Sequence, residues 1–272
     1  MITNVSAHEI VLDKLEIEQY AVPYTEQLFI DDLKLNTLIE NLEQKVYQAP
    51  ENATINDAGE IKSGKTGVAL DKQRFLTLFR EIFYGRKKKK LEVPKMSIYP
   101  KVDSELLAHI SEQKLGSYVT HFKKSNEERS HNISLAAKAI NNYVLFPKES
   151  FSFNQVVGER TTEKGYKRAP VIVKGELAED IGGGICQVSS TLFNAVDLRG
   201  VQIVERYAHS RRVPYVPPNR DATVSWWGPD FVFKNMYNQP ILIRAEANNG
   251  KMIVSIYSSE QAGYSSNDEG SS

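Results

Sequence analysis

The amino-acid sequence predicts an α+β protein with two parts, a small amino-terminal module of helices and a hairpin and a larger α+β domain of a catalytic type. Three observations predict this class. Two helical stripes flank a turn-rich segment in the first hundred residues, alternating apolar residues typical of antiparallel strands gather near the carboxyl end, and three consecutive glycines open a helix that carries the cysteine. The chain has 272 residues, 41% of them apolar, so it can bury a proper core.

The amino-terminal module begins with a predicted helix over residues 31–47. Asp31 and Asp32 suit its first turn, because short acidic side chains accept hydrogen bonds from free backbone N–H groups there. Apolar residues at helical spacing form one stripe, which comprises Leu35, Leu38, Ile39, Leu42 and Val46. Residues 52–67 follow, with the turn sequence Asn56–Gly59 between short β-capable pieces, and this pattern indicates a hairpin.

A second helix is predicted from residue 71 to 84, and Gly85 stands where a left-handed carboxy-terminal cap is expected. Five cations follow it, Arg86 to Lys90. We interpret them as a solvated helix end, since the carboxyl end of a helix favours cations, although such a run could also contact an anionic polymer or nucleic acid. Pro94 and Pro100 then bracket an extended stretch.

Gly116 marks the predicted boundary between the two parts. We therefore expect an amino-terminal module over residues 1–116 and a second domain over residues 117–258. Residues 259–272 are polar and rich in glycine and serine, which predicts a disordered tail.

The second domain is predicted to combine one clear helix with several strands. Residues 132–142 carry apolar residues at helical spacing, and Ser130 is available as the amino-terminal cap. Strand-like patterns follow in residues 201–207, 222–226, 241–245 and 252–256. These strands predict a half-buried antiparallel sheet.

Composition excludes several classes of function. The 34 basic residues equal the 34 acidic ones, so the overall charge gives no reason to expect binding to nucleic acid. One cysteine forms neither an internal disulfide nor a thiolate metal site, and no metal or cofactor is expected. No segment is long and apolar enough to be a membrane helix, and residues 1–10 lack the features of a secretory signal.

The single cysteine, Cys186, is the candidate nucleophile. It falls in the first turn of a predicted helix, where free N–H groups and the helix dipole favour a thiolate. The loop residues expected around it, whose amides could face an oxyanion, are Gly182, Gly183, Gly184 and Gln187. The alternative is a buried structural cysteine beside a tight turn, and spacing alone does not decide between the two. No lysine follows the glycines to make a phosphate-binding loop.

A thiolate nucleophile works best with a general base, and His209 is the strongest of the five histidines for that role. It follows a strand-like segment, so it could lie at a strand end that faces the cysteine helix. Asp221 could orient its imidazole, which gives the chain order Cys, His, Asp. Surface or turn positions are the alternatives for both residues, and His131 is a second candidate base whose neighbours favour a capping role.

Arginines cluster around His209 in the sequence and indicate an anionic substrate, because guanidinium groups bind carboxylates with paired hydrogen bonds. These arginines are Arg206, Arg211, Arg212 and Arg220. Tyr215, Trp226 and Trp227 could form an apolar wall for a sugar or peptide, although aromatic residues at strand spacing more often belong to a core.

Four motifs in the second domain together resemble the VanW domain. They are Phe151–Asn154, Gly158–Thr161, Gly182–Ala195 and Asp221–Val224. The resemblance covers about residues 117–257, and the fourteen-residue block around Cys186 is its most specific part. Residues 20–115 more loosely resemble a peptidoglycan-binding domain that often precedes VanW domains.

The resemblance implies chemistry on peptidoglycan, because some VanW-domain proteins are regarded as L,D-transpeptidases. It implies that Cys186 is the nucleophile and adds Arg160 to the expected substrate-binding residues. We expect a cysteine L,D-transpeptidase that forms 3→3 crosslinks, with stem peptides and glycan as partners, in the cell envelope. The alternatives are a cysteine peptidase or carboxypeptidase on the stems and a non-catalytic wall- or glycopeptide-binding protein.

Overall fold

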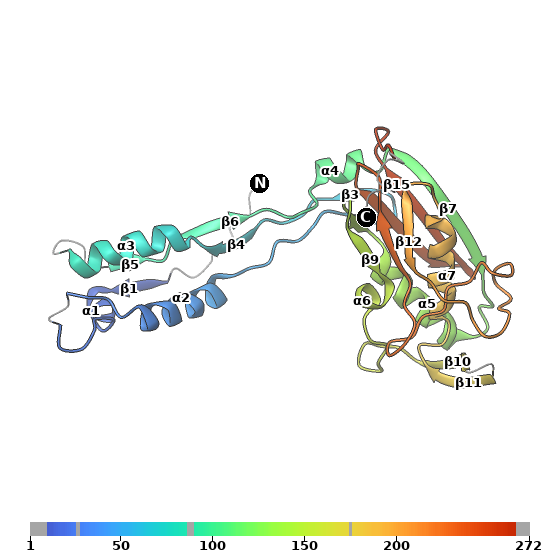
Figure 1. Ribbon diagram of the computed structural model, residues 1–272, viewed down its shortest axis with the longest axis horizontal. Helices are drawn as coiled ribbons and strands as arrows, with labels where there is room; N and C mark the ends of the chain where they lie inside the picture. The colour runs from blue at the N-terminus through green and yellow to red at the C-terminus, as the bar shows by residue number, and fades with distance from the viewer. Residues whose placement is uncertain (1–9, 26–27, 86–89, 174–175, 265–272) are drawn as a thin grey trace, which may run out of the picture. The chain divides into compact units, whose positions relative to one another are not determined.

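The computed structural model shows an α+β protein, as predicted (Figure 1). It describes residues 10–25, 28–85, 90–173 and 176–264. Within these residues, no helix combines the length and apolar character needed to cross a membrane. The chain divides into two compact units, of which the first comprises residues 1–54 and 62–104 and the second comprises residues 55–61 and 105–272.

The first unit is built around two amphipathic helices, α2 (Asp32–Val46) and α3 (Lys72–Tyr84), so the helices predicted there are confirmed. Asp31 and Asp71 are their amino-terminal caps, each accepting a hydrogen bond from a backbone N–H three residues on. The other elements are β1 (Val11–Asp13), α1 (Lys14–Glu18), β4 (Gly67–Leu70), β5 (Lys90–Glu92) and β6 (Lys95–Ile98). Antiparallel pairs join β1 to β5 and β4 to β6.

The hairpin predicted over residues 52–67 is also confirmed, as β2 (Thr54–Ile55) and β3 (Ile61–Lys62). The prediction for Gly85 is wrong. Its φ of −89° and ψ of 154° are extended, so the chain leaves α3 without a left-handed turn. Of the predicted cation run, residues 86–89 lie outside the described residues and Lys90 begins β5.

The predicted domain boundary at Gly116 falls inside a strand, β7 (Gln113–His121). Gly116 pairs there with Ile256, and a Cβ atom at this position would lie 2.6 Å from the backbone oxygen of Ala195. Gly116 therefore permits a close approach between a strand and a helix rather than marking a linker. In the predicted tail, Ser259 is buried, and residues 265–272 lie outside the described residues.

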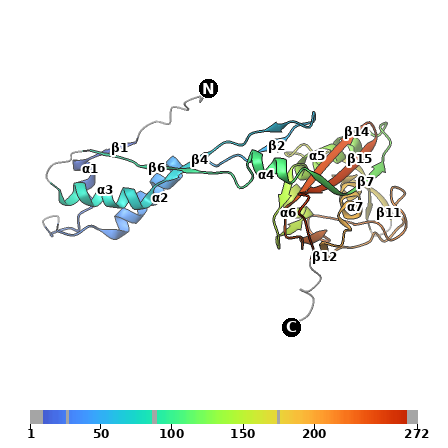
Figure 2. The same ribbon diagram turned by 90° about the horizontal axis from the view of Figure 1, so that it is seen from above.

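The second unit contains a four-stranded antiparallel sheet in the order β7, β15, β14, β8, of which the first three are seen side by side in Figure 2. A three-stranded sheet in the order β12, β13, β9 and a hairpin β10–β11 complete its strands. The strands after β7 are β8 (Tyr143–Leu145), β9 (Ser150–Ser152), β10 (Arg168–Val173), β11 (Glu176–Ile181), β12 (Val201–Glu205), β13 (Val232–Asn235), β14 (Ile241–Asn248) and β15 (Lys251–Ser258). The helices are α4 (Ser104–His109), α5 (Glu127–Ile140), α6 (Phe153–Val157) and α7 (Ile185–Val196).

The core of the second unit lies between its larger sheet and the helices α5 and α7. The α5 helix packs on β14, α7 packs on β7 and β15, and the two helices contact each other. Fully buried residues from both helices and the sheet meet there, among them Ile133, Ile140, Val188, Leu192, Ile243 and Val254. This packing fixes the orientation of α7, whose first turn carries Cys186.

The strands predicted over residues 241–245 and 252–256 are confirmed as parts of β14 and β15. Two other predictions need correction. The helix expected from residue 132 begins at Glu127, because the side chain of Asn126 caps it by accepting from the N–H of Arg129, and Ser130 lies inside the helix. Residues 222–226 form a loop instead of a strand: the backbone of Ala222 bonds to serine hydroxyls of α7, and the N–H groups of Thr223 and Ser225 bond to loop carbonyls.

Candidate active site

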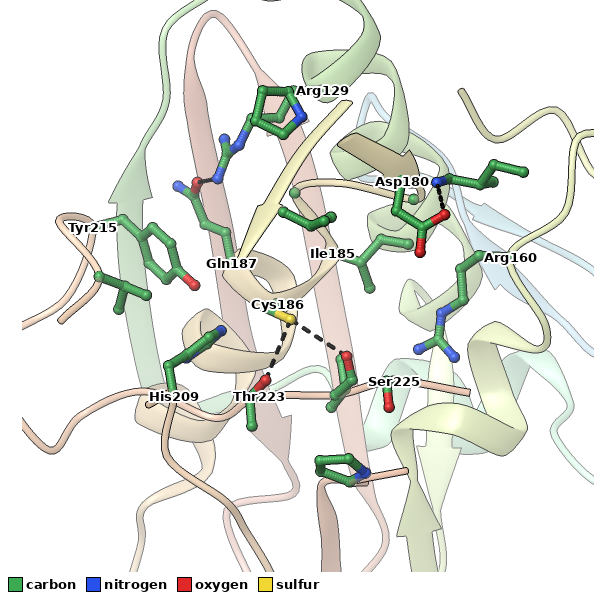
Figure 3. A pocket seen from close by; sticks show the side chains of 18 of the residues that line it. Arg129, Arg160, Asp180, Ile185, Cys186, Gln187, His209, Tyr215, Thr223 and Ser225 are labelled. Atoms are coloured by element: carbon green, nitrogen blue, oxygen red, sulfur yellow. Dashed lines mark hydrogen bonds between the residues drawn. The ribbon is translucent and has the colours of Figure 1, made fainter. Parts of the chain in front are cut away.

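A cleft of about 1340 Å³ in the second unit contains many of the residues predicted for the site (Figure 3). It is lined by the start of α5, the hairpin β10–β11, the start of α7 and the loops around residues 208–215 and 223–229. Pockets for drug-sized ligands measure roughly 300–1,000 Å³, so this cleft can hold a larger, peptide-sized ligand. Predicted site residues that line it are Arg160, Gly182, Gly184, Cys186, Gln187, His209, Tyr215 and Trp226.

The glycine loop brings the chain sharply from β11 into α7. Gly182 and Gly184 have φ values of +86° and +106°, which side chains rarely permit. A Cβ atom on Gly183 would lie 2.5 Å from the backbone oxygen of Ala169. Each of the three glycines is therefore required by backbone geometry, and together they allow α7 to begin directly at the edge of the cleft.

Asn132 fixes this loop from the side of α5. Its side-chain amide donates to the carbonyl oxygens of Lys167 and Gly183, at 2.8 and 3.0 Å, and its Oδ1 accepts from the N–H of Lys167 at 2.8 Å. Asn132 is fully buried, so these bonds are shielded from water. The loop before Cys186 is consequently held in one conformation.

Cys186 is the second residue of α7, and its Sγ lies between the loop residues Thr223 and Val224. The sulfur is 3.4 Å from the carbonyl oxygen of Val224 and 3.8 Å from Oγ1 of Thr223. Burial raises the pKa of the thiol, but the hydrogen bond and charge of His209, together with the hydrogen bonds of Val224 and Thr223, outweigh burial, and the pKa lies below its ordinary value. The Cys186 side chain therefore favours the thiolate more than an ordinary cysteine does.

His209 and Asp221 form a close pair beside the thiol. Nδ1 of His209 lies 2.6 Å from Oδ2 of Asp221, and the backbone N–H of His209 donates to the same oxygen at 2.6 Å. Both side chains are at least 90% shielded from solvent. The structure thus brings Cys186, His209 and Asp221 together in the order that the sequence suggests.

The pKa values of the pair shift in opposite directions. Burial lowers the pKa of His209, but the bonds and charges of Cys186 and Asp221 raise it to a net value above the ordinary one. Burial raises the pKa of Asp221, but the hydrogen bonds from His209 lower it to a net value below the ordinary one. This arrangement favours a thiolate, an imidazolium and a carboxylate in a row.

Hydroxyl groups of α7 hold the loop that carries Asp221. Ser189 and Ser190 both donate to the carbonyl oxygen of Ala222, and the N–H of Ala222 donates to Oγ of Ser190 at 2.9 Å. These contacts link the helix of the nucleophile to the loop of the carboxylate. They hold the backbone of Ala222 in a loop and not in a sheet.

Most of the arginines expected to bind substrate lie outside the cleft. Arg206 donates to the carbonyl oxygen of Asp221 at 2.7 Å, so it supports the loop, and its guanidinium lies over the ring of Phe193. Arg211 and Arg212 are exposed and do not line the cleft. These three arginines are therefore close to His209 in the sequence but do not line the cleft.

Two other arginines line the cleft on different sides of Cys186 (Figure 3). Arg160 has both outer nitrogens buried without a hydrogen-bond partner among the described residues. Arg129, from the first turn of α5, donates from Nη2 to Oε1 of Gln187 at 2.8 Å. Burial lowers the pKa of both guanidinium groups. Sequence analysis missed Arg129, because it lies 57 residues before Cys186 in a helix that was predicted to start later.

Aromatic side chains also line the cleft, among them Tyr215, Trp226 and Trp227. Tyr215 is half-buried near Arg129, and burial raises the pKa of its hydroxyl. Trp226 and Trp227 form an edge-to-face pair, with Trp227 88% exposed. They project from a turn over residues 225–229, which we call the tryptophan turn. Asn154 holds this turn by donating to the carbonyl oxygens at both of its ends, at 2.9 and 3.1 Å.

The second candidate base, His131, lies elsewhere. Its Nε2 is 2.9 Å from the carbonyl oxygen of Gly165, and it does not line the cleft. Among the described residues, no three His, Cys, Asp or Glu side chains are grouped closely enough to hold a metal ion. The site is therefore a thiol, imidazole and carboxylate site flanked by two cations.

Comparisons with known proteins agree on one family. Residues 128–257 match the family described as VanW like protein. Over 243 residues, which are 89% of this chain and 80% of the relative, the sequence is 62% identical to the uncharacterized protein YoaR of Bacillus subtilis. Over 141 residues it is 28% identical to the vancomycin B-type resistance protein VanW of Enterococcus faecalis, with 50% of this chain and 51% of that protein covered. No solved structure matches the chain. The chain belongs to the VanW family.

Proposed function

We propose that this protein is a cysteine L,D-transpeptidase that joins peptidoglycan stem peptides in the cell envelope. The observation that carries the proposal is the row of Cys186, His209 and Asp221 at the wall of a cleft large enough for a peptide. The similarity to a vancomycin B-type resistance protein of Enterococcus supports a role connected with the cell wall. The amino-terminal unit would hold glycan and so raise the local concentration of stems.

The first half of the reaction forms a thioester. The Cys186 thiolate attacks the carbonyl carbon of the diamino acid in a tetrapeptide stem, and a tetrahedral intermediate forms. His209, as imidazolium, gives its proton to the nitrogen of the terminal D-alanine as the C–N bond breaks. Free D-alanine leaves. The backbone amides of Gly183 and Gly184 are our candidates for holding the oxyanion.

The second half transfers the acyl group. The side-chain amine of a diamino acid in another stem attacks the thioester carbonyl, and neutral His209 accepts the proton that this amine loses. The C–S bond then breaks, which restores the thiolate and imidazolium and leaves a 3→3 crosslink. Asp221 keeps the ring of His209 oriented throughout, because both its ring and its backbone N–H are bonded to the carboxylate.

Product masses test this proposal. Purified protein and its Cys186→Ala variant are incubated with disaccharide-tetrapeptides, and the products are analysed by mass spectrometry. We expect dimers that lack one D-alanine, together with free D-alanine, from the unmodified protein alone. His209→Ala should abolish the dimers, while His131→Ala, a matched change outside the cleft, should not.

The other outcomes separate the alternatives. Disaccharide-tripeptide without dimers would show that water is the acceptor, and the protein would be a carboxypeptidase. If neither product forms and both proteins bind the wall polymer equally, the catalytic proposal fails and the protein is a binder. Dimers made by the Cys186→Ala variant would exclude the thiol as the nucleophile.

A further inference from the structure

Lys123, Arg129 and Arg160 line the cleft together with the carboxylates of Glu159 and Asp180, but the two arginines have no acidic partner among the described residues. Placing charged groups in a partly buried site is unfavourable unless an opposite charge or hydrogen bonds compensate. The unpaired arginines therefore complement an anionic ligand, and carboxylate is the group that guanidinium binds best in a peptide.

Only one of these arginines is accessible to such a ligand. The outer nitrogens of Arg160 each expose less than 1 Å², and its guanidinium lies over the ring of Phe153. Arg160 can therefore act on the thiolate through its charge, but a ligand does not reach its N–H groups in this conformation. The guanidinium of Arg129 makes one hydrogen bond within the described residues, from Nη2, and none of its nitrogens is both buried and unpaired.

Gln187 holds Arg129 in a fixed orientation. The Gln187 side chain is only 1% exposed, and its Nε2 donates to Oγ1 of Thr120 at 2.9 Å and to the carbonyl oxygen of His121 at 3.0 Å. These two bonds leave Oε1 as the group that faces Arg129 (Figure 3). A glutamine orients the guanidinium without neutralising it, whereas a glutamate would cancel its charge. The positive charge is thus preserved for a ligand in the cleft.

We propose that Arg129, oriented by Gln187, is the specificity-determining residue that binds a substrate carboxylate beside the scissile bond. This inference rests on the proposed function. A donor stem whose diamino acid is a diaminopimelate has two such carboxylates, one on the terminal D-alanine and one on the side chain of that diamino acid. Both offer the same chemistry to a guanidinium, so the experiment must separate them.

Binding measurements on a non-reacting protein test the proposal. In a Cys186→Ala background, isothermal titration calorimetry compares three tetrapeptide stems: the free acid, the amide at the D-alanine carboxyl and the amide at the diamino-acid side chain. We expect one amide to bind about 10-fold more weakly than the free acid, or about 1.4 kcal/mol. With Arg129→Gln this difference should vanish, and Arg129→Lys should restore part of it. Whichever amide shows the loss identifies the carboxylate.

Arg212→Gln is the matched control, because Arg212 is exposed and does not line the cleft. It should leave the discrimination between acid and amide unchanged. The carboxylate subsite is refuted if the Arg129→Gln variant still discriminates between acid and amide. It is also refuted if this variant binds all three peptides more weakly by the same factor while its melting temperature falls. Equal binding of acid and amides before any change at Arg129 refutes the subsite alone. If the Cys186→Ala protein that retains Arg129 binds none of the three peptides, both the subsite and the proposed function fail.

Discussion

Removing the imidazole of His209 should raise the pKa of the Cys186 thiol and slow its alkylation at neutral pH. The pKa of Cys186 lies below its ordinary value because the hydrogen bond and charge of His209, with smaller contributions from Val224 and Thr223, overcome the effect of burial. In His209→Ala, burial remains and the two contributions of His209 are lost. The thiol pKa should then rise toward its ordinary value of about 8.5.

The expected size of this effect follows from the thiolate fraction. Well below its pKa, a thiol loses about tenfold in thiolate fraction for each unit by which the pKa rises. The nucleophilicity of the thiolate rises about threefold per unit of pKa, which offsets part of that loss. The alkylation rate at neutral pH should therefore fall by about threefold for each unit by which His209→Ala raises the thiol pKa above neutral pH.

Alkylation with iodoacetamide, followed by mass spectrometry from pH 5 to 10, measures both quantities. The midpoint of the rate profile is the decisive value, since it reports the thiol pKa independently of nucleophilicity. We expect the midpoint of His209→Ala to lie well above that of the unmodified protein, and His131→Ala to leave it unchanged. Coincident midpoints for His209→Ala and the unmodified protein would refute the ion pair between Cys186 and His209.

Three further predictions concern stability. Gly183→Ala should destabilise the fold by about 1–3 kcal/mol in urea unfolding, because its Cβ atom would lie 2.5 Å from the backbone oxygen of Ala169; an unchanged midpoint would contradict the described loop. Asn154→Ala should lower the free energy of unfolding by about 1–3 kcal/mol and alter the tryptophan fluorescence, because it releases both ends of the tryptophan turn. An emission spectrum identical to that of the unmodified protein would contradict this. Asp221→Asn should be less stable than the unmodified protein at neutral pH. Folding lowers the pKa of Asp221, so the stability that its carboxylate contributes is present above about pH 4 and is lost as the pH falls through the folded pKa. The unfolding midpoints of the two proteins should therefore converge in acid. A difference that stays constant with pH would exclude this linkage.

Regular elements with a clear period were predictable from the sequence. The stripes of α2 and α3, the alternation in β14 and β15 and the turn of the β2–β3 hairpin each reflect a local rule of burial or backbone geometry. The loop over residues 222–226 broke such a rule. It alternates in polarity like a strand, but the backbone N–H and carbonyl of Ala222 bond to serine hydroxyls of α7. No local sequence pattern predicts such a long-range partner.

The candidate site divides in the same way. Cys186 and its glycines are adjacent in sequence, so their shared loop was predictable, and His209 with Asp221 followed from the needs of thiol chemistry. Arg129 was not predictable. It reaches the cleft only because α5 packs beside α7, and its orientation depends on Gln187. Long-range packing decided which arginines face the thiol.

The way the second unit is assembled from separate stretches of chain limits its use as a portable module. The segment that matches the family, residues 128–257, omits β7, which covers one edge of β15 and supplies Thr120 to hold Gln187. It also omits residues 55–61, whose Ile55 exchanges two hydrogen bonds with Asn142. A gene fragment that encodes only the matched segment would expose the edge of β15 to pairing with other chains. Recombination that moves this domain between proteins must therefore carry along sequence from well before the segment by which the family is recognised.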